Sequence, residues 1–263
     1  MSDLQNLLQF DGETQALAQV SGRLGWDQET MMASGSAEQR GAEIAALEGV
    51  IHARRCNPQV GDWLSNIKPD TADEMTKAQI REIKRSFDRA TKVPGDLAQL
   101  IARTTSTAQG KWAAARADND FPAFVPVLEE VLNLKQQEGQ ALAENADVYD
   151  TMLTDYEPGA TAKKLSIMFD ALRPGLVELR GRILEKDPAV KLRGPFDEPT
   201  QMKISTLLAE TYGYDLTRGR IDKAVHPFSS GSGQDVRITT RTDLQDPFNC
   251  FYSTIHEVGH GSY

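Results

Sequence analysis

Two histidines near the end of the chain have the spacing of a metal site. His256, Glu257 and His260 form the pattern His-Glu-x-x-His. On an α-helix, residues four apart are rotated by only about 40°, so both imidazoles can project from one side and share a cation. Glu257 lies about 100° from His256, which suits a base that reaches a water on the cation better than it suits a ligand. The pattern predicts Zn²⁺ held by two neutral imidazoles, with Glu257 taking a proton from the water that attacks a carbonyl.

The residues around this pattern indicate the helix that would carry it. Asp246 and Pro247 are typical of a helix start, as a capping residue followed by a first-turn proline. The apolar side chains of Phe248, Phe251, Ile255 and Val258 fall on the arc opposite the histidines. We therefore expect one face of this helix to pack into a core while the other offers the two imidazoles to a cleft.

Other residues with chemical potential have plainer alternatives. His52 has no partner ligand near in sequence, so a structural role is expected, and Cys250 is expected to be a buried packing residue. His226 begins a Pro-containing loop, where a structural role competes with a place in the cleft. Asp235 and Arg237 are candidate substrate-binding residues, because a guanidinium can hold a peptide or the site's scaffold, but a cross-strand ion pair explains them equally well.

Helical periodicity dominates the part of the chain that must position these residues. Capping patterns at Ser36 with Gln39, Thr71 with Glu74, Asp120 with Pro122, and Thr161 predict helix starts, and Pro174 should kink or split the last helix. After residue 213 the texture changes. Residues 226–234 read as a turn-rich loop, and residues 235–242 alternate with period two, as a half-buried strand does. We predict one mainly α domain over 1–263, with a helical part (1–213) and a part (214–263) holding a small antiparallel sheet, the loop and the metal-binding helix.

Composition excludes several classes of protein. The 263 residues carry 29 Lys and Arg against 38 Asp and Glu, a formal net charge of -9, without a basic block, so nucleic acid is not expected as a partner. No apolar run approaches the 18 or so residues of a membrane span, and the first residues lack the features of a signal peptide. The two cysteines cannot make a disulfide framework, which favours the cytoplasm.

Several separate stretches of the chain resemble one family of enzymes. They are residues 26–32 (WDQETMM), 149–161 (YDTMLTDYEPGAT), 226–228 (HPF) and 235–241 (DVRITTR), the last with the pattern Asp-x-Arg-x-Thr. Together with His-Glu-x-x-His they identify the sequence as a member of the carboxypeptidase Taq-type metallopeptidases. The resemblance implies removal of single residues from peptide C-termini, a zinc or cobalt ion, a largely helical fold with a small active-site sheet, and often a homodimer.

Two features depart from that family's pattern. Ala33 stands where the family usually has proline, and the chain stops at Tyr263, three residues after His260. The resemblance implies a third ligand, a glutamate on a later helix, and substrate-carboxylate contacts that also lie downstream. We therefore expect the N-terminal part of a metallocarboxypeptidase whose site is incomplete in these residues. The alternative hypothesis is a non-catalytic helical module that keeps an incomplete metal half-site.

Overall fold

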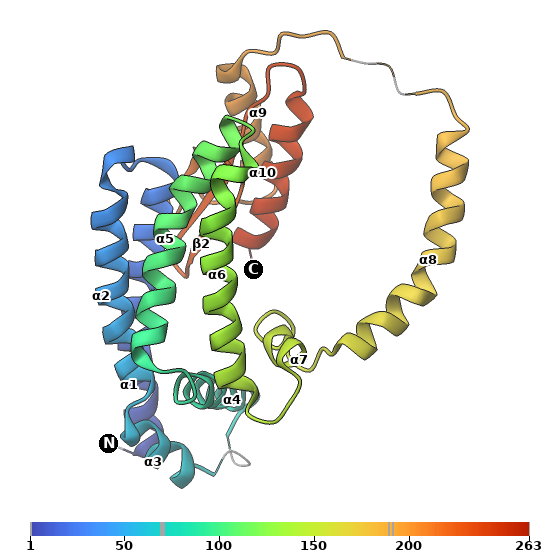
Figure 1. Ribbon diagram of the computed structural model, residues 1–263. Coiled ribbons are helices and arrows are strands. Elements are labelled where there is room, and N and C mark those ends of the chain that lie inside the picture. Colours follow the sequence, from blue (N-terminus) through green and yellow to red (C-terminus); the bar gives the residue numbers. More distant parts are fainter. Residues whose placement is uncertain (1, 69–71, 189, 191, 263) are drawn as a thin grey trace. The chain divides into compact units, whose positions relative to one another are not determined.

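The computed structural model describes residues 2–68, 72–188, 190 and 192–262 and is mainly α-helical (Figure 1). The helices are α1 (Asp3–Thr30), η1 (Ser34–Ser36, a 3₁₀ turn), α2 (Ala37–Arg55), α3 (Pro58–Asn66), α4 (Glu74–Ala90), α5 (Gly95–Ala117), α6 (Phe121–Ala143), α7 (Val148–Leu153), α8 (Ala162–Leu184), α9 (Glu198–Thr211) and α10 (Pro247–Gly261). The strands are β1 (Ile221–Lys223), β2 (Ser229–Ser232) and β3 (Asp235–Thr240). The predicted fold class is confirmed, and the described strands all follow residue 213.

The chain divides into two units. Met1–Leu132 with Gly194–Tyr263 form the first, and Asn133–Arg193 form the second. The first unit contains α1 to α5, α9, the sheet and α10, and therefore every candidate site residue. The second contains the end of α6 together with α7 and α8. A single peptidase domain over 1–263 stays a prediction.

Local capping explains several helix starts. The Asp120 carboxylate accepts a hydrogen bond from the backbone N–H of Ala123 at 3.1 Å, and Thr161 Oγ1 accepts one from Lys164 N–H at 3.2 Å. Both side chains satisfy N–H groups that have no partner inside their helix. The predicted starts of α6 and α8 are confirmed.

Three other local predictions fare differently. Ser36 precedes α2 but its side chain makes no capping bond, because η1 has already begun the helical path. Thr71 lies outside the described residues, and α4 is capped by Asp73, whose carboxylate accepts from Thr76 N–H at 2.9 Å. Helix α8 continues through Pro174, so it is not split, and Figure 1 shows the helix changing direction near its middle, in agreement with the predicted kink.

The sheet is mixed, and the prediction of an antiparallel sheet is wrong for β1. The strand order is β1-β3-β2, with β2 antiparallel to β3 and β1 parallel to it. Residues 226–234, expected to be loop, contain β2, which turns into β3 at Gly233 with a φ of 65° that glycine adopts without strain. Because β1 enters from α9 on the other edge, no hairpin joins it to β3, and it is free to run parallel.

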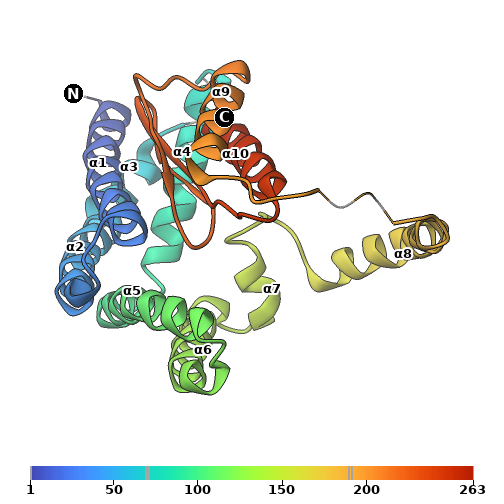
Figure 2. The ribbon, with the colours of Figure 1, turned by 90° about the horizontal axis from the view of Figure 1, so that it is seen from above.

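The sheet lies between two helical layers. Helix α1 packs against β2 on one side, and α10 packs against β3 and α9 on the other, as Figure 2 shows. A small core of Ala209, Tyr214, Ile238 and Val258 joins α9, the sheet and α10. A second core of Leu7, Val60 and Ile83 joins α1, α3 and α4. Strand β2 thus packs against both α1 and α10, and β3 lies beside it against α10.

Among the described residues, no helix has both the length and the apolar character that crossing a membrane requires.

Candidate metal centre

Helix α10 starts where the sequence predicts. The Asp246 carboxylate accepts a hydrogen bond from Phe248 N–H at 3.1 Å, and Pro247 takes the first helical position. The loop before it is fixed by Gln201, which is buried on α9. The Gln201 amide nitrogen donates to the carbonyl of Asp243 at 2.9 Å, and its oxygen accepts from Asp243 N–H at 3.2 Å.

Buried hydroxyl groups hold α10 against the sheet and α9. Thr240, the last residue of β3, donates to the carbonyl of Cys250 at 3.0 Å, and Thr254 donates to the same carbonyl at 2.9 Å. Ser205 of α9 lies 3.2 Å from the Cys250 sulfur. Cys250 is fully buried, which confirms its expected packing role. These bonds keep the register of α10 relative to β3.

The packed face of α10 differs from the predicted one. The buried side chains are Cys250, Thr254, Glu257 and Val258, whereas Phe248 is 45% exposed. At Gly261 an added Cβ would lie 3.3 Å from Tyr214 Cε2, so glycine allows the helix end to approach the sheet closely. A helix held this near accepts small side chains on its inner face, and of the predicted apolar arc only Val258 is buried.

The two imidazoles lie together on the exposed side of α10. His256 Nε2 and His260 Nε2 are 3.2 Å apart, and the rings meet edge to face with centroids 4.8 Å apart. Two neutral imidazoles at this distance can share a proton through one N–H···N bond. The same pair can instead direct both lone pairs at one cation. The predicted juxtaposition of His256 and His260 is confirmed.

Glu257 points inward beside them and is only 5% exposed. Burial raises the pKa of its carboxyl, while positive charge on His256, His260 and His226 acts in the opposite direction. Both effects follow from its place at the base of the histidine pair. The arrangement provides a carboxyl group that can exchange a proton next to two metal-type ligands.

A third ligand is not found among the described residues. No group of three or more His, Cys, Asp or Glu side chains is placed there to hold a metal ion. His52 is engaged elsewhere, with its Nε2 2.8 Å from the carbonyl oxygen of Val93, so its expected structural role is confirmed.

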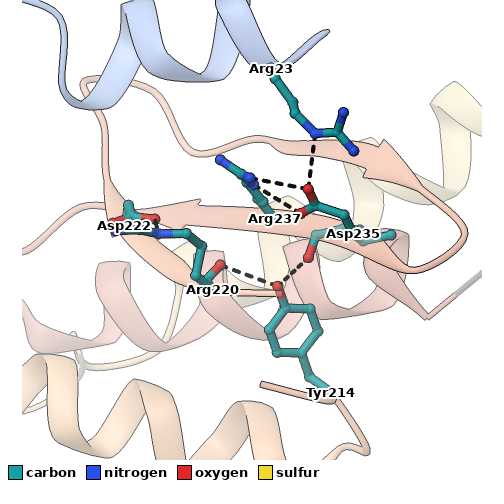
Figure 3. Close-up of polar contacts among 7 residues, drawn as sticks. Arg23, Tyr214, Arg220, Asp222, Asp235 and Arg237 are labelled. Carbon is teal, nitrogen blue, oxygen red and sulfur yellow. Dashed lines mark hydrogen bonds and ion pairs between the residues drawn. The ribbon is translucent and has the colours of Figure 1, made fainter. Parts of the chain in front are cut away.

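Asp235 and Arg237 pair along one strand and not across strands. Arg237 donates two hydrogen bonds to the Asp235 carboxylate, at 2.9 and 3.1 Å, and Arg23 of α1 donates a third at 3.0 Å (Figure 3). These donors hold the pKa of Asp235 below its usual range. The Arg237 guanidinium also stacks over Trp26 of α1, 4.4 Å from the ring centre. The pair's contacts are therefore with α1 and not with the histidines of α10.

Tyr214 connects β3, the strand of this pair, to the residue that precedes β1. Its buried hydroxyl donates to the carbonyl of Val236 at 2.6 Å and lies 3.2 Å from that of Arg220 (Figure 3). Burial raises the pKa of the Tyr214 hydroxyl. The residue holds β1 and β3 together on the side of α10.

A pocket of about 660 Å³ opens between α1, α5 and the segment that contains β2. Its walls include Trp26 and Glu29 of α1, Trp112 of α5, and His226 and Phe228. His226 lines this pocket, whose lining does not include His256, Glu257 or His260, so its place in the cleft of the metal site stays a prediction. Trp26, Glu29 and Phe228 fall in stretches that carry the family resemblance, but their meeting could not be predicted because it depends on how α1, α5 and β2 pack together.

Comparisons with known proteins agree with the resemblance. The family described as carboxypeptidase Taq (M32) metallopeptidase matches residues 6–263. A thermostable carboxypeptidase 1 from Thermus thermophilus is 35% identical over 277 residues, covering 98% of this chain and 54% of its own length. The structure of Trypanosoma cruzi metallocarboxypeptidase 1 matches 99% of this chain and 54% of that one, with a TM-score of 0.83 at 26% identity. An M32 carboxypeptidase from Deinococcus radiodurans R1 matches with a TM-score of 0.80 at 32% identity, over 98% of this chain and 53% of that one. The chain thus spans about half the length of these relatives.

Proposed function

Because the chain belongs to the carboxypeptidase Taq (M32) metallopeptidase family, we propose that it carries half of a metal-dependent carboxypeptidase site. In this proposal His256 and His260 hold the metal, and Glu257 is the acid–base group for hydrolysis of the C-terminal peptide bond of a peptide. The observation that carries it is the 3.2 Å separation of the two Nε2 atoms beside a buried carboxyl. The alternative, a non-catalytic module, is not favoured by the family.

The histidine pair fits a tetrahedral metal ion. Two nitrogen ligands about 2.05 Å from one ion, at the tetrahedral angle, stand about 3.3 Å apart. The Nε2 atoms of His256 and His260 lie 3.2 Å apart, close to that separation. When bound, such an ion supplies Lewis-acid chemistry, which polarises a carbonyl and makes water acidic near neutral pH. Imidazole suits zinc first and cobalt as well, and we propose zinc.

Glu257 moves the proton in this scheme. Its carboxylate accepts a proton from the attacking water and returns it to the nitrogen of the departing residue. Burial favours this exchange, because it raises the pKa of the Glu257 carboxyl from its usual value towards neutral pH. Glu257 is not a ligand in the proposal, so its role is separable from metal binding.

Asp235 and Arg237 remain proposed substrate-binding residues of lower rank. Arg237 is already engaged by the Asp235 carboxylate and the Trp26 ring, so a peptide carboxylate would have to share it. The observed contacts support a scaffold role, with Arg237 orienting α1 against the sheet. The third ligand and the main carboxylate contacts are expected from residues that the relatives carry beyond this length.

The partners and compartment are also proposals. The substrate class is a peptide with a free C-terminus, and a homodimer is the expected assembly. Both Cys56 and Cys250 are free thiols, which supports the cytoplasm as the compartment.

The Glu257→Gln variant of the complete protein tests the mechanism. We expect it to keep its metal, because the amide replaces no ligand, and to lose turnover by about 100-fold or more, because the proton acceptor is gone. Metal content by elemental analysis and release of the C-terminal residue from an unblocked peptide are measured on the same sample. Glu210→Gln, on the exposed face of α9, is the matched control. Near-normal turnover in Glu257→Gln removes Glu257 from the mechanism.

A further inference from the structure

The pocket between α1, α5 and β2 has walls that are mostly apolar. Its lining includes the indole rings of Trp26 and Trp112 and the ring of Phe228, around a volume of about 660 Å³. That volume falls in the range of small-ligand sites and exceeds one side chain. Trp26 is 5% exposed, so its ring is held rigidly in the wall. A pocket of this kind binds an apolar group by removing it from water.

Residues of β3 and the preceding loop hold this wall in place. Thr239 is fully buried and accepts a hydrogen bond from Phe228 N–H at 2.8 Å, while Thr239 N–H donates to the Phe228 carbonyl at 2.8 Å. Arg237 of the same strand covers Trp26 at 4.4 Å, and Arg220 lies 4.9 Å from the same ring. The strand that anchors α10 therefore also fixes the pocket.

Two helix glycines form part of the pocket surface. Gly22 and Gly25 lie inside α1, where each glycine costs about 1 kcal/mol relative to alanine. A Cβ at either position would meet no atom within 4 Å, so packing does not require glycine there. A side chain at either glycine would extend into the pocket.

The charges around the pocket oppose a charged guest. Glu29 disfavours an anion, and its carboxylate accepts a hydrogen bond from Gln109. The guanidinium groups of Arg220 and Arg237 on Trp26 disfavour a second cation at that ring. A neutral side chain meets neither penalty.

The segment that contains β2 joins the pocket to the helix of the proposed site. His226, Phe228 and Ser230 of this segment line the pocket, and β2 packs against both α1 and α10. The pocket therefore borders the elements that carry the proposed site.

We propose that this pocket is a subsite for an aromatic or large aliphatic side chain of the peptide substrate. The proposal rests on the proposed function for the identity of the guest as a peptide, and it goes beyond that function by naming the side-chain class. A segment of the protein itself is the competing occupant.

Fluorescence of the pocket tryptophans tests the proposal without catalysis. In a Trp63→Phe variant of the 263-residue chain the remaining tryptophans are Trp26 and Trp112, and a chelator removes metal so that no peptide is hydrolysed. The probes are the tripeptides Ala-Phe-Phe, Ala-Ala-Ala, Ala-Lys-Lys and Ala-Glu-Glu, titrated against this chain. We expect Ala-Phe-Phe to bind about tenfold or more tightly than each of the other three. Equal binding, or tighter binding of the Lys or Glu peptide, overturns the proposal. Binding of none of them shows that the pocket is filled by the protein itself and overturns it too.

The glycines supply the variant and its control. Gly25→Leu should fill the pocket, abolish the preference for Ala-Phe-Phe and leave the unfolding midpoint unchanged or raised. Gly12→Leu, on the same helix in open space outside the pocket lining, should leave the preference intact. Trp112→Ala is a second test and should weaken Ala-Phe-Phe binding several-fold. An unchanged preference in both Gly25→Leu and Trp112→Ala overturns the proposal. The turnover of Glu257→Gln is measured with metal present, so it tests the proposed function separately from the pocket.

Discussion

We expect residues 1–263 alone to bind zinc weakly, through His256 and His260 only. Four-ligand zinc sites in small domains contribute about 10–16 kcal/mol, or roughly 2.5–4 kcal/mol per ligand. Two ligands then give roughly 5–8 kcal/mol, which corresponds to a dissociation constant between about 1 μM and 0.2 mM. The 3.2 Å spacing of the two nitrogens places the expected value towards the tighter end, because α10 already holds both imidazoles close together.

Single substitutions distinguish the metal ligands from histidines that do not bind the metal. His260→Ala leaves one imidazole and should raise the dissociation constant by roughly 70- to 900-fold, the equivalent of one ligand. His52→Ala is the matched control. His52 lies on α2, with its Nε2 2.8 Å from the Val93 carbonyl oxygen, so its loss should not affect zinc binding. His226→Ala should likewise leave zinc binding unchanged.

Competition with a chromophoric chelator at neutral pH measures these constants directly. A nanomolar dissociation constant for the unmodified chain would refute the reasoning, because two imidazoles cannot supply it. A loss in His226→Ala as large as that in His260→Ala would show that His226 is a third ligand.

Two further predictions concern the strands beside the site. Tyr214→Phe removes the hydroxyl that donates to the Val236 carbonyl and should lower the free energy of unfolding by about 1–2 kcal/mol in urea titrations. Burial raises the pKa of Tyr214 in the folded state, so the hydroxyl's contribution to stability is complete below about pH 10 and is lost as the pH rises further. The unmodified protein and Tyr214→Phe should therefore become equally stable above about pH 10. Asp235→Asn should cost about 1 kcal/mol at neutral pH, since the pair with Arg237 is only partly buried. The lowered pKa of Asp235 makes that contribution complete above about pH 4 and lost below it, so a difference that persists at pH 2 would contradict the ion-pair explanation.

The position of the histidine pair could be predicted because its signals are local. Asp246, Pro247 and the four-residue spacing of His256 and His260 all fall within one helix, and helix geometry alone brings the imidazoles together. The juxtaposition of the two imidazoles depends only on the helix itself, so it can be predicted from the sequence.

The packed face of the same helix could not be predicted from apolar residues. The sequence favours Phe248, Phe251 and Ile255, but the structure buries Cys250 and Thr254 and exposes Phe248. The reason is tertiary. How closely α10 approaches β3 is set by Gly261 and by the Thr240 bond to Cys250, and a close approach selects small side chains. Hydropathy ranks side chains by size and polarity and carries no information on that distance.

The sheet shows the same limit. Strand β1 has three residues, Ile221–Lys223, too few to display an alternating pattern, and its parallel pairing is set by where α9 ends. Strand β3 has six residues with a clear alternation and was located correctly. The structure adds that Ile238, Thr239 and Thr240 are all buried, because helices cover both faces. A half-buried strand was therefore the wrong expectation, and the cause is the α1 layer that no pattern within β3 reveals.

The Asp-x-Arg-x-Thr pattern lies on one of the two covered faces of β3. Side chains alternate along a strand, so Arg237 and Thr239 face α1 and the β2 segment, where they hold Trp26 and Phe228.

Thr240, one residue later, faces the opposite side and holds α10 through the Cys250 carbonyl. One short strand thus fixes the pocket wall with one face and α10, which carries the proposed metal ligands, with the other. A shift of β3 by one residue would exchange these faces and displace both parts together. The three residues of the pattern all lie on the face towards α1 and the β2 segment, and Thr240, which follows the pattern, is the residue that supports α10.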